Sequence, residues 1–237
     1  MLSAIKTTQI ALLQDQFRLQ VLSQNVSNLH TTGYKRQIME SQDFPALDAP
    51  DFETVVQQMA SLSNFQQGSI SHSNQGSELA LAGKGFFEIQ NNEGVFYTRS
   101  GEFHISQDGE LISERGGKLM GKNGPVRVSD KEFSINTKGE LFIDKQLSDQ
   151  IRIVDFPQPA SLHYQGEGLY FSKDLPEEAS SETRVLQFSL EQSNVKSVDE
   201  MTEMLKISRH FEAIQRIMKT SNNLLSTAIS QLGEGNV

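Results

Sequence analysis

The chain has 237 residues, 36% of them hydrophobic, with a net charge of −9 and no cysteine. The missing cysteines exclude disulfides, thiolate zinc sites and thiol catalysis. No run of 18 apolar residues is present, so we expect no membrane-spanning segment. A basic segment followed by a continuous apolar one is also missing at the N-terminus, so we expect no Sec-type signal peptide.

The charge is unevenly distributed along the chain. Residues 1–35 carry +2, residues 193–237 carry 0, and the stretch between them carries −11. Near-neutral ends can pack against copies of themselves with little repulsion, whereas an acidic middle suits a solvated surface. Nucleic acid is therefore not an expected partner.

Residues 1–29 are expected to form a helix with two apolar faces. One face repeats at seven-residue intervals with intermediate leucines: Ile5, Leu12, Leu19, Leu22, Val26 and Leu29. The other lies nearly opposite at 100° per residue: Ile10, Leu13, Phe17 and Val21. One partner helix cannot cover both faces. Because Gln, Ser and Thr are frequent, we expect this helix to be weak alone and to order on assembly.

Residues 30–35 are expected to break the helix, and residues 36–75 to form an irregular connector. Gly33 is the natural turn residue. Asn25 and Asn28, just before it, either cap the fraying helix or form hydrogen bonds across a helix interface. A short helix is possible around the apolar residues Phe52, Val55, Val56 and Met59. A first strand is expected near residues 68–72.

From Glu78 to Phe171 apolar residues alternate with polar ones, in short runs separated by glycine-containing turns. This period of two predicts an antiparallel β domain. Residues 102–111 and 132–141 share the pattern Glu-Phe-x-Ile-x-x-x-Gly-Glu-Leu, which predicts two similar hairpins. Residues 172–184 are expected to be an exposed loop, and residues 185–190 a last strand.

Residues 197–232 are expected to form a long helix, about 50 Å at 1.5 Å per residue. Ser197 and Glu200 have the spacing of a capping box. Two lines repeat at seven-residue intervals. The first is Met204, Phe211, Met218, Leu225 and Leu232, and the second is Ile207, Ile214, Ser221 and Ala228. The pattern predicts either a coiled-coil seam or a core helix with a broad apolar face.

No active site is expected from these residues. The five histidines are scattered and none has metal-ligand spacing with another. Gly83-Lys-Gly85 lacks the third glycine and the following helix of a phosphate loop, so we interpret both glycines as turn residues that allow close backbone packing. The sequence predicts no catalytic residue, no metal and no cofactor.

The predicted fold class is therefore α+β, with three parts. Residues 1–35 and 193–237 form a discontinuous helical coiled-coil domain, residues 36–75 a connector, and residues 76–192 an inserted antiparallel β domain. Helical faces left unmatched within one chain predict contacts between copies. The residues expected at this assembly interface are Ile5, Leu12, Leu19, Leu22, Asn25, Val26, Asn28, Met204, Ile207, Phe211, Ile214, Met218, Leu225 and Leu232.

Three segments in this order resemble the flagellar basal-body rod and hook family, the axial proteins of the bacterial flagellum. The first runs from Ser23 to Arg36 and is rich in asparagine. The second combines residues 68–70, 78–87 and 97–103. The third combines residues 190–195, 200–204 and 209–212. Together they cover both ends and the middle of the chain.

The resemblance implies a helical tube whose inner core is built from the terminal helices, with the β domain outside. It implies copies of this chain and other rod and hook proteins as partners, and location in the basal body. It also implies export through the flagellar type III apparatus without a cleaved signal peptide. The short length favours a proximal or distal rod protein over the hook protein.

Two other functions compete with this structural, non-enzymatic interpretation. A closed coiled-coil oligomer could present the β domain as a binding head, and sedimentation would then detect an oligomer of fixed size. An enzyme using the acidic surface would require a pocket with strongly perturbed carboxylates. Nothing in the sequence favours the enzyme.

Overall fold

The structure is a computed structural model that describes residues 2–39, 60–128, 133–180 and 182–234. The chain divides into two compact units. The first comprises Met1–Val26, Gln37–Leu62 and Lys196–Val237, and the second comprises Ser27–Arg36 and Ser63–Val195. Two helices near the ends of the chain and antiparallel sheets between them confirm the predicted α+β class.

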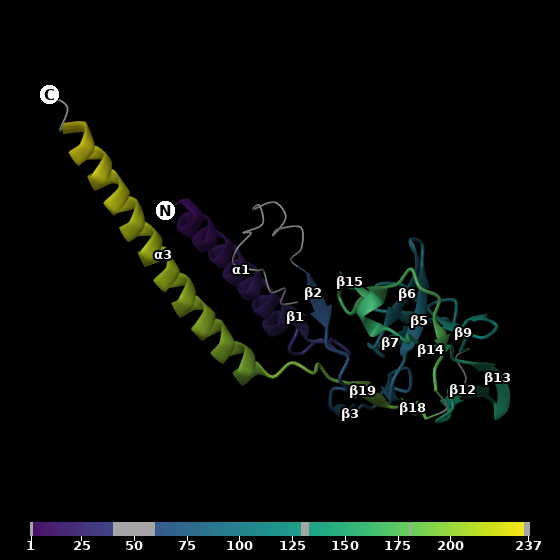
Figure 1. Ribbon diagram of the computed structural model, residues 1–237. Helices are drawn as coiled ribbons and strands as arrows, with labels where there is room; N and C mark the ends of the chain where they lie inside the picture. Colours follow the sequence, from purple (N-terminus) through teal and green to yellow (C-terminus); the bar gives the residue numbers. More distant parts are fainter. Residues whose placement is uncertain (1, 40–59, 129–132, 181, 235–237) are drawn as a thin grey trace. The chain divides into compact units, whose positions relative to one another are not determined.

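The first unit contains the two helices (Figure 1). Helix α1 spans Leu2–Ser27 and helix α3 spans Ser197–Glu234, so both predicted helices are confirmed. A two-stranded sheet of β1 (Gln37–Met39) and β2 (Ser61–Ser63) was not predicted. The predicted short helix around residues 52–59 lies outside the described residues.

The predicted capping box at the start of α3 is wrong. The Ser197 hydroxyl donates to the Met201 sulfur at 3.8 Å. The Glu200 backbone N–H, which a capping box would pair with the Ser197 hydroxyl, donates to the Lys196 carbonyl at 3.1 Å. The Glu200 carboxylate accepts a hydrogen bond from the Asn25 side chain at 3.1 Å. Glu200 is buried, with 1% of its surface exposed, and its partner Asn25 comes from helix α1, 175 residues earlier in the chain.

The second unit is built on a ten-stranded sheet in which β15, β16, β6, β5, β9, β8 and β7 are neighbours in that order. Strands β10 and β14 pair with β9 and β5, and β17 pairs with β14. Their bounds are β5 (Phe86–Asn91), β6 (Gly94–Thr98), β7 (Phe103–Ile105), β8 (Leu111–Ser113), β9 (Lys118–Gly121), β10 (Gly124–Pro125), β14 (Ile153–Asp155), β15 (His163–Gly166), β16 (Leu169–Phe171) and β17 (Glu177–Glu178). A short 3-10 helix, η1 (Pro159–Ser161), precedes β15.

Three smaller antiparallel sheets complete this unit. Strands β11 (Phe133–Ile135), β12 (Glu140–Ile143) and β13 (Gln146–Gln150) form one. Strand β4 (Leu79–Ala82) pairs with β18 (Arg184–Gln187), and β3 (Ile70–His72) pairs with β19 (Ser189–Glu191). The predicted single last strand is therefore two strands, because Phe188 between them adopts a left-handed φ of 58°.

Both hairpins predicted from the repeated pattern are present, and their turns have the same geometry. Hairpin β7–β8 and hairpin β11–β12 each turn at a glycine, Gly109 with φ 75° and Gly139 with φ 76°. The same backbone hydrogen bond closes both turns, from Gly109 to Ser106 at 3.0 Å and from Gly139 to Asn136 at 2.9 Å. The repeated sequence pattern therefore encodes one turn geometry twice.

Strand β5 separates two apolar clusters, because its alternate side chains point to opposite faces. Phe87 and Ile89 belong to the larger cluster, which includes Leu81, Phe103 and Leu119. Phe86 belongs to an aromatic cluster formed with Tyr97, Val154, Phe156, Leu162 and Tyr170. A strand buried on both faces needs no polar side, which explains the apolar pair Phe86-Phe87.

Glu88, also on β5, is buried with 5% of its surface exposed, and its Oε2 lies 3.2 Å from Nε of Arg152. Burial raises the pKa of Glu88, and the Arg152 charge opposes part of this rise. The folded state therefore binds this proton more tightly than the unfolded chain. The contribution of Glu88 to stability falls as pH rises from its unfolded pKa, about 4.3, through the raised folded pKa.

Replacing Glu88 with Gln is therefore expected to raise the free energy of unfolding at pH 7. The gain should shrink as the pH is lowered to 4, because the wild-type carboxyl is then already protonated. Urea unfolding at both pH values measures this difference, with Glu93→Gln in the exposed β5–β6 turn as the control. An equal loss of stability at both pH values would contradict this explanation.

Candidate assembly interface

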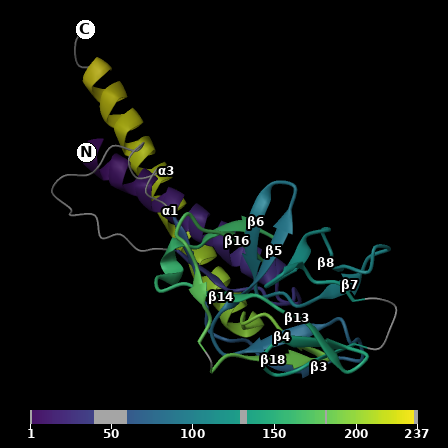
Figure 2. The same cartoon turned by 90° about the vertical axis from the view of Figure 1, so that its right-hand side faces the viewer.

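Helices α1 and α3 of the first unit run antiparallel beside each other (Figures 1 and 2). Asn25 contacts Glu200, and ten residues earlier on α1 Asp15 lies 2.6 Å from Nδ1 of His210, ten residues later on α3. Helix α3 has 38 residues and α1 has 26, so the last turns of α3 extend past the start of α1. This extension has no α1 partner.

Asn25 joins both helices to strand β1. Its amide nitrogen donates to the Gln37 carbonyl at 2.8 Å and to Glu200 at 3.1 Å, and its oxygen accepts from the Gln37 backbone at 2.8 Å. The interpretation as a hydrogen bond across a helix interface therefore holds for Asn25. Asn28, in the second unit, accepts from the Thr31 hydroxyl at 3.1 Å, a local contact typical of a helix end.

The buried face of α3 follows one of the two predicted lines. Ile207 and Ile214 are buried, and Glu200 continues their seven-residue spacing. The other predicted line, Met204, Phe211 and Met218, is half-buried. On α1, Leu22 is buried and Leu12, Leu19 and Val26 are half-buried. The side chains of Ile5, Leu225 and Leu232 are outside the description.

Helix α3 also exposes apolar side chains that the sequence analysis did not assign to an interface. Val198 is 76% exposed, Met201 51% and Leu205 62%. At 100° per residue these three lie within about 60° of one another and opposite Ile207, so we call them the outer stripe. Farther along, Ile217 and Leu224 are 62% and 66% exposed. The sequence does contain a signal for the outer stripe, because Val198 and Leu205 are also seven residues apart.

In the second unit, the three segments of the family resemblance meet at Glu191. One Glu191 oxygen lies 2.6 Å from Nζ of Lys35 and accepts from the Gly68 backbone at 2.9 Å, and the other lies 3.3 Å from the Arg99 guanidinium. The Glu191 carbonyl accepts from the Gly33 backbone at 2.7 Å. We call Lys35, Arg99 and Glu191 the junction triad.

The junction triad is buried, with side-chain exposures of 0% for Lys35, 3% for Arg99 and 0% for Glu191. Burial lowers the pKa of Lys35 and of Arg99, while the Glu191 carboxylate opposes both shifts. The Arg99 guanidinium also lies 5.3 Å from the Phe86 ring centroid, a cation–π distance. Two buried cations therefore depend on one carboxylate.

Gly33 lets residues 27–36 approach this triad. It adopts φ +67°, and a Cβ there would lie 2.3 Å from the Arg99 backbone carbonyl carbon. Gly83 and Gly85, with φ +118° and +115°, also lie in turns against other segments, where a Cβ on Gly85 would come within 3.1 Å of the Val154 carbonyl. All three glycines lie at close backbone approaches.

Asn194 fixes the same segments from the other side. It accepts from the Arg36 backbone at 2.7 Å, and its amide donates to the carbonyls of Asn64 and Gln66, both at 2.8 Å. The sequence analysis quoted Lys35, Arg99, Glu191 and Asn194 within motifs but gave them no role. Their presence in the three segments of the family resemblance was the only sequence feature that pointed to them, and it did not predict that they are buried together.

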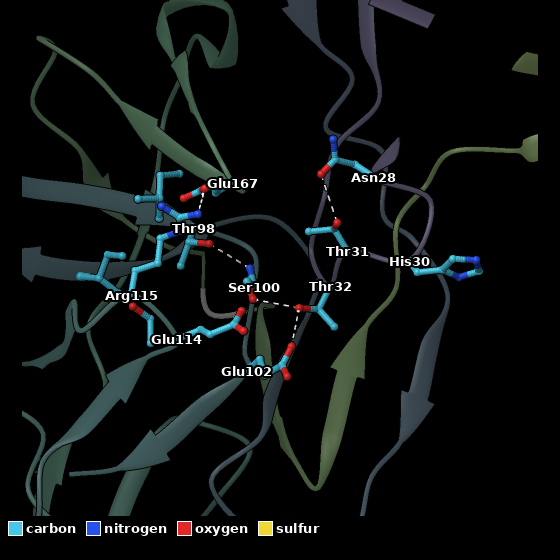
Figure 3. Close-up of a pocket in the computed structure, with 13 residues that line it drawn as sticks. Asn28, His30, Thr31, Thr32, Thr98, Ser100, Glu102, Glu114, Arg115 and Glu167 are labelled. Atoms are coloured by element: carbon cyan, nitrogen blue, oxygen red, sulfur yellow. Dashed lines mark hydrogen bonds and ion pairs between the residues drawn. The ribbon is translucent and has the colours of Figure 1, made fainter. Parts of the chain in front are cut away.

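A polar pocket of about 380 Å³ lies in the second unit beside residues 28–32 (Figure 3). The Thr32 hydroxyl donates to Glu102 at 3.1 Å and lies 3.0 Å from the Ser100 hydroxyl. Glu114 also lines the pocket, and Glu167 is paired with Arg115. The lining carries three carboxylates and one guanidinium, so we call it the acidic groove.

The described residues contain no group of three or more His, Asp or Glu that could hold a metal ion. None of the described helices is long and apolar enough to cross a membrane. The outer stripe of α3 and the acidic groove are exposed surfaces of the kind through which proteins associate.

Two family models match this chain. The model described as flagellar hook protein FlgE/F/G D1 domain matches residues 80–143, and the model described as flagellar basal body rod FlgEFG protein C-terminal matches residues 186–232. The first covers six of the strands of the ten-stranded sheet (β5–β10) and β11–β12, and the second covers the end of β18, all of β19 and most of α3.

Similar proteins match over almost the whole chain. The flagellar basal-body rod protein FlgF of Caulobacter vibrioides is 28% identical, covering 92% of this chain and 93% of that protein. FlgG of Borreliella burgdorferi is 26% identical, covering 96% of this chain and 98% of that protein. FlgG of Bacillus subtilis is 27% identical, covering 91% of this chain and 93% of that protein. The matches therefore include both terminal helices and the β structure between them.

Proposed function

We propose that this chain, a member of the flagellar basal-body rod and hook family, is a structural subunit of the rod. Its partners are copies of itself and other axial proteins, and its location is the basal body. The observation that carries the assembly mechanism is the outer stripe of α3, which is apolar and exposed in the single chain. A rod subunit has neighbours that can cover it.

The terminal helices make the assembly contacts in this proposal. Helices α1 and α3 pack as an antiparallel coiled coil, with Ile207 and Ile214 facing α1 and the outer stripe facing a neighbour. The outer stripe of one copy meets a different surface of the next copy, so the contact is heterologous and does not close. Heterologous contacts that do not close produce helical polymers. The polymer is the drive shaft and encloses the export channel.

The remaining assignments follow from the same proposal. Residues 1–35 and 193–237 form the core domain of the rod, residues 36–75 connect it, and residues 76–192 form the outer β domain. The interface includes residues that the single chain leaves half-buried, namely Leu12, Leu19, Val26, Met204, Phe211 and Met218. The chain reaches the rod through the type III export apparatus, and its role there is structural.

Helix α1 becomes fully ordered only on assembly in this mechanism. No side chain of residues 7–14 is buried, whereas Asp15, Val21, Leu22 and Asn25 are. The first half of α1 is therefore only partly packed, and it has less buried surface than the second half to offset its weak helix propensity. A neighbouring subunit supplies the missing contacts.

Deleting residues 2–26 tests this function. The deletion removes α1 but keeps residues 27–36, which belong to the second unit. We expect the truncated chain to keep the thermal unfolding transition of the β domain and to be missing from purified basal bodies. Limited proteolysis should cleave the free full-length chain within residues 7–14 and spare them in basal bodies. Normal incorporation of the truncated chain, or a closed oligomer of fixed size in sedimentation, would contradict the proposal.

A further inference from the structure

The second unit carries a basic groove on a chain that is otherwise acidic. A groove of about 510 Å³ is lined by Lys122, Lys138, Arg152 and Arg184, with Glu178 as its one acidic residue. Its remaining lining includes Ile151, Ile153 and Ala179, so a partner meets apolar surface between the cations. The groove shares no residue with the acidic groove.

Two of these four cations already have an acidic partner and two are available to another molecule. Lys122 lies 3.8 Å from Glu178, and Arg152 forms an ion pair with Glu88 at 3.2 Å. Lys138 and Arg184 are exposed, and neither side chain forms an ion pair with another described residue. The basic groove therefore presents two uncompensated positive charges.

The acidic groove has the complementary character. Arg115 is occupied by Glu167, which leaves Glu102 and Glu114 as the uncompensated charges, and both are exposed. Glu102 accepts only a neutral hydroxyl from Thr32 among its described contacts. Two free carboxylates on one groove match two free cations on the other.

We propose that the basic groove of one copy binds the acidic groove of a second copy, an inference that rests on the proposed rod function. Copies whose residues 36–192 each carry a net charge of −11 repel one another at long range. A polymer that places these regions side by side needs local complementarity to offset that repulsion. Two different surfaces of the same unit make the contact heterologous, which suits a helical assembly.

A charge exchange tests the proposed contact. Lys138→Glu with Arg184→Glu should reduce the amount of the chain in basal bodies roughly tenfold, because two attractions become repulsions. Glu102→Lys with Glu114→Lys should have a similar effect. The four substitutions together should restore incorporation, because both partners are reversed. The matched control is Lys145→Glu with Lys173→Glu, which makes the same charge change outside both grooves.

Cysteine cross-linking provides an independent measurement, because the chain has no cysteine of its own. Lys138→Cys combined with Glu114→Cys should give a ladder of disulfide-linked copies in oxidised basal bodies, and neither single substitution should. Normal incorporation of both charge-reversed pairs, or failure of the fourfold exchange to restore it, would overturn the contact while leaving the rod function standing. Absence of the wild-type chain from basal bodies would contradict the rod function itself.

Discussion

Replacing Glu191 with Gln is expected to lower the free energy of unfolding of the second unit by about 3–5 kcal/mol. The substitution keeps the shape of the side chain but removes the only carboxylate of the junction triad. Lys35 and Arg99 would then be two buried cations without the carboxylate that both of them contact. The Gly68 backbone would also lose its charged acceptor. Urea unfolding at pH 7 measures the loss.

Two further variants separate this mechanism from a general effect of losing an acid. Glu177→Gln, at an exposed position on β17, should change stability by less than about 0.5 kcal/mol. Lys35→Met added to Glu191→Gln should recover part of the loss, because one unpaired buried charge is removed. If Glu191→Gln were as harmless as Glu177→Gln, the triad would not hold the three motif segments together.

Replacing Leu205 with Asp is expected to leave the protomer folded and to reduce its incorporation into basal bodies roughly tenfold or more. Leu205 is 62% exposed in the single chain, so its loss costs little folding energy. At an apolar contact between copies, however, a carboxylate would be buried without a partner. Circular dichroism measures the fold, and quantitative immunoblotting of basal bodies measures incorporation.

Leu175→Asp is the matched control for this variant. Leu175 is 90% exposed in the acidic loop of the second unit, and the change in chemistry is the same. We expect it to be incorporated normally. Phe211→Ala, on the half-buried line of α3, should also reduce incorporation while the β domain stays folded. Equal incorporation of all three variants would show that α3 is not part of the assembly interface.

The elements that were predicted correctly have strong local signals. The seven-residue repeat identified α3, and the repeated Glu-Phe-x-Ile pattern identified two hairpins with the same turn. The errors are at positions where distant residues decide the local structure. Glu200 has the spacing of a capping box, but its backbone N–H bonds to the Lys196 carbonyl and its carboxylate accepts a hydrogen bond from Asn25, 175 residues away.

The junction triad could not be deduced from spacing for the same reason. Lys35 and Glu191 are 156 residues apart, and Arg99 lies 92 residues from Glu191. Charged residues are usually solvated, so a single sequence gives no reason to bury these three together. The break at Phe188 was missed because a non-glycine residue with φ 58° has no local sequence signal.

The sequence predicted an apolar seam on α3 but not which residues the single chain would leave exposed. Heptad spacing gives lines of residues and does not say which line meets α1. The structure has Ile207 and Ile214 buried and the outer stripe exposed. Helix α3 therefore has one apolar face for its own chain and a second that we assign to a neighbour.

Cysteine labelling of the outer stripe tests this assignment most directly. Met201→Cys would be the only cysteine in the chain, and Leu175→Cys would be a separate reference at an exposed loop. We expect a maleimide to label both variants in the free protein, and to label Leu175→Cys but not Met201→Cys in intact basal bodies. Labelling of Met201→Cys in basal bodies at the rate of the free protein would show that no neighbour covers α3, and would contradict assembly through this helix.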